Sequence, residues 1–175
     1  MKVEDTKTNL VNGVASSYYG ATNVGSLIHK CKYENGGDFP DALVKQTLRA
    51  FRKQFGKEKF DIILYVPPTE SGDLVKHFAE KISSALNIPL SDNLKKIKQT
   101  QPQKVFQNYF LKHDNVAGAF EYTKPREVIG KSILLSDDVF DSGASIKEIG
   151  KLLTHLGTAK ITSLIIAKTV GGDLQ

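Results

Sequence analysis

The chain has 175 residues, enough for one domain with a substantial core, and its 40% hydrophobic and 25% charged residues are typical of a water-soluble globular protein. The formal net charge of +5 suits either an anionic small molecule or a nucleic acid as a partner. A single cysteine, Cys31, excludes an internal disulfide and a multi-cysteine zinc site, and no apolar stretch is long enough to span a membrane. We therefore expect a cytoplasmic protein with no membrane partner.

The order of the expected elements indicates the fold class. We expect residues 1–14 to be a loose polar leader and residues 15–175 to be a single domain. Hydrophobic periodicity predicts helices over residues 25–33, 39–55, 72–86 and 146–156, strands over residues 60–66, 133–135 and 161–167, and shorter extended segments near residues 88–94 and 116–122. Because strands alternate with helices, the sequence predicts an α/β fold with a mostly parallel central sheet and helices on both faces.

The most informative stretch is 132–145, which reads S-I-L-L-S-D-D-V-F-D-S-G-A-S. A short apolar run leads directly to Asp137 and Asp138, and a turn then opens the next helix. Ligands of open α/β sheets bind at the carboxyl ends of parallel strands, and the first N–H groups of a helix point at a bound anion. Gly143 allows the backbone to approach a ligand closely, and Ser142 and Ser145 add hydroxyl donors. The stretch therefore predicts a site for a ligand that carries both a diol and a phosphate.

An Asp-rich loop at this place has two alternative interpretations, of which the sequence excludes one. A calcium-binding EF-hand frame that starts at Asp137 ends correctly at Glu148, but Val139 occupies its third position and Ser142 replaces its glycine, so this frame is excluded. An ordinary strand–loop–helix, in which Ser142 or Ser145 merely caps the helix, stays open. The chain contains neither G-x-x-x-x-G-K-[ST] nor G-x-G-x-x-G, the common nucleotide-binding loops.

A second loop, V-P-P-T-E-S-G at residues 66–72, also follows a predicted buried strand and opens a helix. By itself this pattern is more typical of an ordinary strand-to-helix turn than of a binding loop. Beside the acidic stretch, we expect the two loops to bind the two ends of one elongated anion. The candidate residues of this second loop are Pro67, Pro68, Thr69, Glu70, Ser71 and Gly72.

The stretch 132–145 resembles the signature of type I phosphoribosyltransferases that binds phosphoribosyl pyrophosphate (PRPP): an apolar strand, two acidic residues and a turn of the form D/T-S/T-G-x-S/T. The resemblance implies a Rossmann-like fold with a small hood, transfer of a phosphoribosyl group to a nitrogen acceptor, and Mg²⁺ held by Asp137 and Asp138 mainly through water. The same two carboxylates would hold the ribose hydroxyls, and the loop at residues 67–72 would contact pyrophosphate. The expected phosphate cradle is Asp141, Ser142, Gly143, Ala144 and Ser145, with Asp141 also a candidate general base.

Residues 93–113 contain five lysines and no acidic residue. The resemblance implies a lid here that closes over PRPP and excludes water, and Lys98 and Lys104 are the candidate catalytic groups because they flank Pro102. A solvated basic face is an alternative. A groove for single-stranded DNA is another, because Phe106, Tyr109 and Phe110 lie between the lysines.

Further segments resemble narrower groups. L-I-H-K-C-K-Y-E-N-G-G is similar to the ComF/GntX-like branch, which is linked to DNA uptake, although this chain lacks the zinc module of that branch. V-P-P-T-E-S-G-D-L-V, P-Q-K-V-F-Q-N and I-A-K-T-V-G-G-D look closer to a phosphoribosyltransferase-like domain fused to some RecQ-family DNA helicases. This resemblance implies an excised or stand-alone C-terminal domain, a DNA helicase or single-stranded DNA as partner, and an accessory role as the alternative to catalysis. The sequence contains no recognisable pattern for binding a purine or pyrimidine acceptor, and it is compatible with a homodimer.

Overall fold

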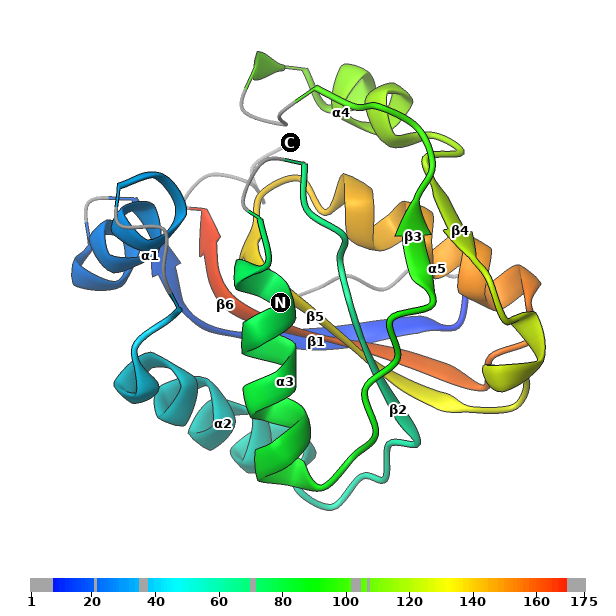
Figure 1. Cartoon of the computed structure of the whole chain (residues 1–175), viewed down its shortest axis with the longest axis horizontal. Helices are drawn as coiled ribbons and strands as arrows, with labels where there is room; N and C mark the ends of the chain where they lie inside the picture. Colours follow the sequence, from blue (N-terminus) through cyan, green and yellow to red (C-terminus); the bar gives the residue numbers. More distant parts are fainter. Residues whose placement is uncertain are drawn as a thin grey trace.

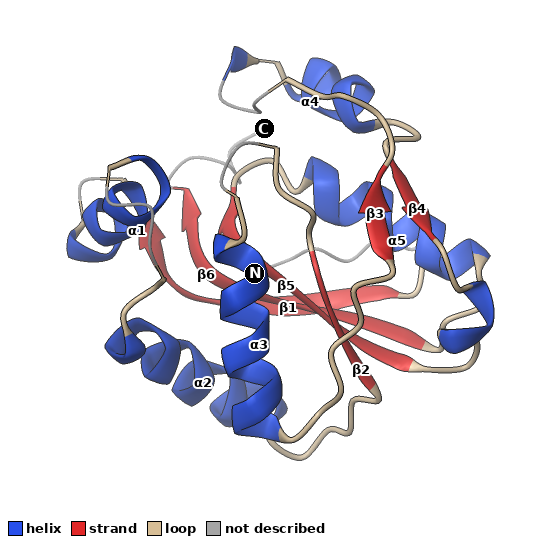
Figure 2. Ribbon diagram, in the orientation of Figure 1, coloured by secondary structure: helices blue, strands red, loops and turns tan. Residues whose placement is uncertain are grey.

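A four-stranded parallel sheet forms the centre of the molecule (Figures 1 and 2). The computed structural model describes residues 8–20, 22–34, 38–69, 72–101, 105–106 and 108–169. The strand order is β1-β6-β5-β2, and a separate antiparallel ribbon pairs β3 with β4. The strands are β1 (Leu10–Tyr19), β2 (Ile62–Tyr65), β3 (Leu94–Lys96), β4 (Phe120–Tyr122), β5 (Ser132–Phe140) and β6 (Lys160–Thr169).

Helices cover both faces of the sheet, which confirms the predicted α/β class. The helices α2 and α3 pack on one face, while α5 and the β3–β4 ribbon cover the other, with α1 and α4 at the end where the strands finish (Figure 1). Within the described residues, no helix combines the length and the apolar character needed to cross a membrane. The helices are α1 (Asn23–Tyr33), α2 (Asp41–Phe55), α3 (Leu74–Leu86), α4 (Tyr109–Val116) and α5 (Ala144–His155), with a 3-10 turn, η2, at Pro125–Glu127.

Strict alternation along β5 builds the two cores. Leu134 points to the core under α2 and α3, whereas Ile133 and Leu135 point to the core under α5. All three side chains are fully buried, and burial of each stabilises the fold by about 2 kcal/mol. The continuous apolar run therefore reflects a parallel strand that is covered on both faces.

The expected leader at residues 1–14 is wrong for residues 10–14, which belong to β1. This strand lies at the sheet edge and pairs in parallel with β6. Asn12 and Gly13 interrupt its apolar residues in the manner of a turn and so concealed it. Gly13 has a packing reason, since a Cβ there would clash with the side chain and carbonyl of Ser163. Residues 1–7 lie outside the described residues.

Two other expectations change in detail. The strand β5 continues past the acidic pair to Phe140, because residues from Asp137 onward still pair with β6. The extended segment near residues 88–94 contributes only a bridge between Leu90 and Ile63, and β3 begins at Leu94.

Candidate functional site

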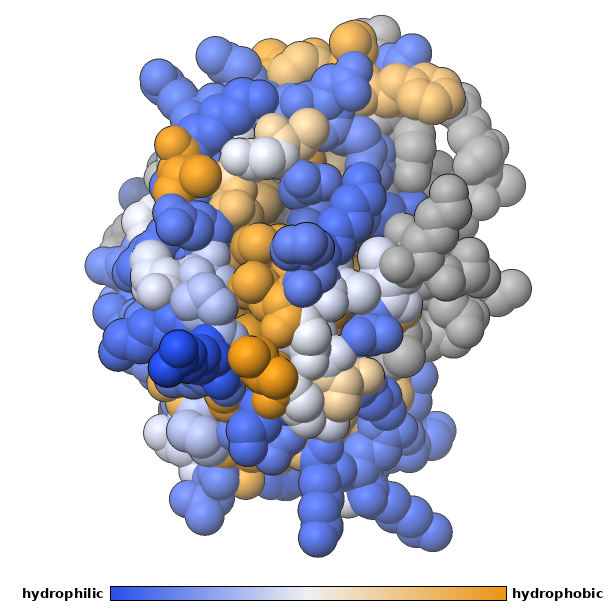
Figure 3. Space-filling model, turned by 90° about the vertical axis from the view of Figure 1, so that its right-hand side faces the viewer, coloured by the Kyte–Doolittle hydropathy of each residue, from blue (hydrophilic) through white to orange (hydrophobic). Residues whose placement is uncertain are grey.

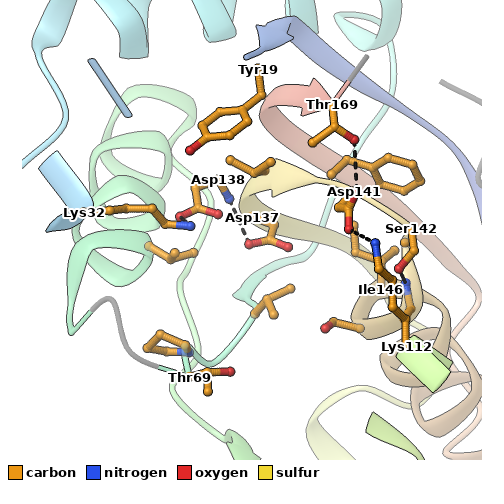
Figure 4. Close-up of a pocket in the computed structure, with 18 of the residues that line it drawn as sticks. Tyr19, Lys32, Thr69, Lys112, Asp137, Asp138, Asp141, Ser142, Ile146 and Thr169 are labelled. Carbon is orange, nitrogen blue, oxygen red and sulfur yellow. Dashed lines mark hydrogen bonds and ion pairs between the residues drawn. The ribbon is translucent and has the colours of Figure 1, made fainter. Parts of the chain in front are cut away.

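A cavity of about 520 Å³ lies at the carboxyl edge of the sheet (Figure 4). Because the four strands are parallel, the segments that follow them meet at this edge. The walls come from β1 and α1, the loop after β2, β3, α4, the end of β5 with the start of α5, and the end of β6. The lining includes Tyr19, Lys32, Pro67, Pro68, Thr69, Lys96, Lys112, Asp137, Asp138, Asp141, Ser142, Gly143, Ala144, Ser145 and Thr169.

The turn between β5 and α5 has the geometry of an anion cradle. Gly143 has a φ of 73°, in the left-handed region that favours glycine, and a Cβ there would also meet the ring of Phe140 at 2.7 Å. The Ala144 N–H donates to Ser142 Oγ at 3.3 Å. Gly143 immediately precedes α5 and has no side chain to cap it, so the next N–H groups of the first turn suit a bound anion.

The two neighbouring carboxylates of β5 have different surroundings. Asp138 Oδ2 lies 2.6 Å from the Lys32 ammonium of α1, and these side chains are only 6% and 16% exposed. The Asp138 N–H donates to Asp137 Oδ1 at 2.9 Å, which fixes the second carboxylate within the cavity. Figure 4 shows Asp138 next to Lys32, with Asp137 on the other side of the strand end. The pair therefore offers one internally neutralised carboxylate and one that faces the cavity.

The electrostatics follow from this burial. Burial raises the pKa of the Asp137 carboxyl well above its usual range, and the Asp138 carboxylate adds to the effect while Lys32 opposes it. Burial lowers the pKa of Lys32, but the attraction of the Asp138 carboxylate outweighs it, so the net pKa of Lys32 is raised. Lys32 thus stays positively charged beside the acidic pair.

Asp141 is also engaged by its own protein. Its Oδ2 lies 2.5 Å from the Lys112 ammonium of α4, and its Oδ1 accepts a hydrogen bond from Thr169 Oγ1 at 3.1 Å. These contacts join α4 and the end of β6 to the first residue of the anion cradle. To accept a proton as a general base, Asp141 would have to leave the Lys112 ammonium.

The loop after β2 forms the opposite wall. Pro67, Pro68 and Thr69 line the cavity, and Thr69 Oγ1 accepts from the Lys96 ammonium at 2.5 Å. Lys96 also lies over the Phe120 ring, 5.8 Å from its centroid. Burial lowers the pKa of Lys96, and the Asp137 carboxylate opposes this shift. A lysine of the ribbon therefore stands between the loop and the acidic pair.

The structure brings together most of the residues that the sequence singled out. The acidic pair, the whole cradle from Asp141 to Ser145 and residues 67–69 share one cavity. Gly72, with a φ of 54°, precedes α3 but does not line the cavity, and Glu70, Ser71 and Lys104 lie outside the described residues. Lys98 does not line the cavity either, since its ammonium donates to the Ala117 carbonyl at 3.3 Å.

Sequence reasoning missed the roles of the three lysines that line the cavity among the described residues, although two of them follow a pattern. Lys32 lies one helical turn after the fully buried Ile28 on α1. Lys96 shares a strand face with the buried Leu94, while Lys95 between them is exposed. Lys112 had no such signal, because only tertiary packing directs α4 toward the turn between β5 and α5.

Comparison with known proteins agrees with this architecture. Residues 76–172 match the family described as the phosphoribosyl transferase domain, and no curated protein sequence matches the chain. Adenine phosphoribosyltransferase from Saccharomyces cerevisiae is similar in structure over 73% of this chain and 68% of its own, with a TM-score of 0.52 and 15% identity. A purine phosphoribosyltransferase from Pyrococcus horikoshii matches over 75% of this chain and 76% of its own, with a TM-score of 0.48 and 19% identity.

A third solved structure is much longer than this chain. Glutamine phosphoribosylpyrophosphate (PRPP) amidotransferase from B. subtilis matches over 70% of this chain but 26% of its own, with a TM-score of 0.47 and 20% identity. This chain thus spans about a quarter of that enzyme. The family match covers more than half of the 175 residues and includes the acidic pair and the cradle, so the chain belongs to the phosphoribosyl transferase domain family.

Proposed function

We propose that the cavity binds PRPP and that the protein transfers its phosphoribosyl group to a nitrogen acceptor with release of pyrophosphate. The observation that carries this proposal is the cradle at residues 141–145, which shares one cavity of about 520 Å³ with the Asp137 carboxylate and with residues 67–69. PRPP carries a phosphate, a diol and a pyrophosphate, so its site needs a separate set of partners for each of them within one continuous cavity. The family match supports the same reaction class.

In this proposal, the cradle binds the 5-phosphate and Asp137 accepts hydrogen bonds from the ribose hydroxyls. Residues 67–69 and Lys96 contact the pyrophosphate. The bond between C1 and the pyrophosphate oxygen breaks, pyrophosphate leaves with the electron pair, and a bond from C1 to the acceptor nitrogen forms while that nitrogen loses a proton. The protein's contribution is positioning, stabilisation of the leaving charge and exclusion of water.

Magnesium fits the chemistry of these donors, because it prefers carboxylate, phosphate and water oxygens. Among the described residues, no group of three or more His, Cys, Asp or Glu side chains could hold a metal by itself, so ligand oxygens and waters would have to complete the shell. Asp137 and Asp138 would hold the ion, with Asp137 the more accessible because Lys32 already occupies Asp138. When bound, magnesium would neutralise charge on the pyrophosphate.

Asp141 is proposed first as a positioning residue and second as a base. Its contacts with Lys112 and Thr169 hold the first residue of the cradle in place. If the acceptor transfers its proton to Asp141, Lys112 has to move toward the departing or bound phosphate. Lys98 and Lys104 stay proposals for a lid, with Lys98 reaching the cavity only after a rearrangement of residues 93–113.

Calorimetry with PRPP, with and without Mg²⁺, tests the proposal, followed by a screen of nitrogen bases for pyrophosphate release. We expect Mg²⁺-dependent binding that is lost in D137N/D138N. Pyrophosphate release with at least one base in the wild type, and none in the double variant, would identify the acceptor class. Absence of PRPP binding by the folded wild type in both conditions would rule the proposal out.

A non-catalytic role in DNA metabolism is the second candidate, as an accessory domain of a DNA helicase or in DNA uptake. It is supported by Lys95 and Lys98, both exposed, and by exposed apolar side chains nearby, since Ile97 is 60% and Phe110 is 73% exposed. Phe110 is therefore not a core side chain. The face around β3, β4 and α5 is largely hydrophilic, with apolar atoms in small groups (Figure 3). Salt-dependent binding of single-stranded DNA that survives D137N/D138N, together with no PRPP binding, would favour this role.

A further inference from the structure

The Lys32 ammonium occupies the place at the acidic pair where an external cation would be expected. Its Nζ lies 2.6 Å from Asp138 Oδ2, and both side chains are largely buried. The backbone N–H of Asp138 binds Asp137 Oδ1, so the two carboxylates form one unit that Lys32 contacts from the α1 side. Figure 4 shows Lys32 reaching the strand end from a helix that is remote from it in sequence.

The position of Lys32 is built into the fold. Thr22 caps α1 by accepting from the Gly25 N–H at 2.9 Å, and its hydroxyl donates to the Tyr18 carbonyl at 2.8 Å. Gly25 packs so closely on Gly20 that a Cβ would clash with its backbone. Ile28 is fully buried in the core one turn before Lys32. The packing of α1 therefore fixes both its first turn and its buried face, and these together position the Lys32 ammonium.

The other two lysines of the cavity have different partners. Lys112 contacts Asp141 at the phosphate turn, and Lys96 contacts Thr69 on the loop after β2. Buried neighbouring carboxylates are costly unless a cation accompanies them. With Lys32 in contact, the charge of the Asp138 carboxylate is compensated, which leaves the Asp137 carboxyl group to receive a diol.

We infer that Lys32 is the resident cation of the acidic pair, which allows a phosphorylated ribose to bind at Asp137 and Asp138 without a divalent metal ion. This inference rests on the proposed function. Magnesium is then needed for the pyrophosphate half of PRPP and not for the ribose half. A ligand that lacks pyrophosphate, ribose 5-phosphate, separates these two requirements.

The experiment is calorimetric titration of the full chain with ribose 5-phosphate, in EDTA and in excess Mg²⁺. We expect the wild-type affinity to differ by less than about threefold between the two buffers, and the affinity of K32M to fall by about tenfold or more in EDTA and to recover in Mg²⁺. K30M is the matched control, because Lys30 is an exposed lysine of the same helix outside the cavity. It should bind as the wild type does in both buffers.

A second variant keeps the test decisive if K32M folds poorly. K32R keeps a cation beside Asp138, so we expect its affinity for ribose 5-phosphate in EDTA to stay within about threefold of the wild type. Chemical unfolding of K32M, D138N and K32M/D138N, without ligand, should give a double-mutant cycle with clear coupling between the two residues.

Two outcomes would overturn the inference alone. One is a wild type that binds ribose 5-phosphate about tenfold more weakly in EDTA than in Mg²⁺, and the other is a K32M that equals the wild type in EDTA. If the folded wild type binds neither ribose 5-phosphate nor PRPP in either buffer, the proposed function fails with it.

Discussion

The ammonium of Lys112 lies 2.5 Å from Oδ2 of Asp141, so an ion pair joins α4 to the first residue of the phosphate turn. This ion pair links α4, which lies between β3 and β4 in sequence, to the residue that follows β5. A bound phosphate at the turn would meet the Asp141 carboxylate with its charge already compensated. Lys112 is thus a part of the anion site that the local sequence of the turn does not contain.

We expect K112M to weaken PRPP binding by about tenfold, because the Asp141 carboxylate would then repel the phosphate without compensation. K95M is the control, since Lys95 is an exposed lysine of the same basic stretch that does not line the cavity. Its PRPP affinity, measured by calorimetry, should stay within about twofold of the wild type. Equal losses of PRPP affinity in the two variants would mean that only the overall positive charge of the stretch contributes, and not the contact between Lys112 and Asp141.

We expect G143A to destabilise the fold by about 2 kcal/mol or more, because the variant combines a positive φ with a clash against the Phe140 ring. G130A is the matched control: Gly130 has a φ of 68° but open space around its Cβ position. Chemical denaturation of both variants should therefore show a larger loss for G143A. If the two losses are the same, the close packing of Phe140 on the turn has no energetic role.

We expect G25A to destabilise the fold by about 1–3 kcal/mol, although alanine normally favours a helix over glycine. The added Cβ would clash with the backbone of Gly20 and displace the start of α1, which carries Lys32. S26A changes an exposed neighbour on the same helix and should be nearly neutral. Denaturant midpoints report the stability, and a G25A that is more stable than the wild type would contradict this packing.

The hydrogen bonds around Glu127 predict a pH effect on stability. The Tyr122 hydroxyl donates to Glu127 Oε2 at 2.5 Å, and this bond, with Asn93 and Ser91, lowers the pKa of Glu127 below its ordinary value of 4.5. Burial and the bond to Glu127 raise the pKa of Tyr122 to about 12. The stabilisation is fully present above pH 4.5 and is lost as the pH falls through the lowered pKa.

Y122F removes the main donor, so we expect the pKa of Glu127 to move back toward 4.5 and the acid-induced loss of stability below that pH to shrink. Carboxyl chemical shifts from NMR follow the pKa, and denaturation at several pH values follows the stability. An unchanged Glu127 titration in Y122F would show that Asn93 and Ser91 suffice.

The acidic pair and the phosphate turn were predictable because their chemistry is local. An apolar run, two carboxylates and a turn with Gly143 are contiguous in sequence, and parallel strands place such segments at one edge. β1 was missed for the opposite reason, because Asn12 and Gly13 interrupt its apolar residues and its partner, β6, is the last strand of the sheet in sequence. Lys112 was missed because it reaches a carboxylate through helix packing, which no local pattern encodes. The helical spacing of Lys32 from Ile28 gives its face of α1 but not its partner, Asp138.

The pairing of β1 with β6 has a consequence for how the protein comes to its native state. Leu10 pairs with Ile161, so the first and last strands of the sheet close one of the longest loops in the chain. Long-range parallel pairing is slow, and a ribosome releases β6 only after all the other strands of the sheet. Since α1 packs on β1, we expect the Lys32–Asp138 contact to form after this closure. The nascent domain would carry its phosphate turn before its acidic pair acquires a cation, and pulse-labelled hydrogen exchange should find α1 protected later than α3.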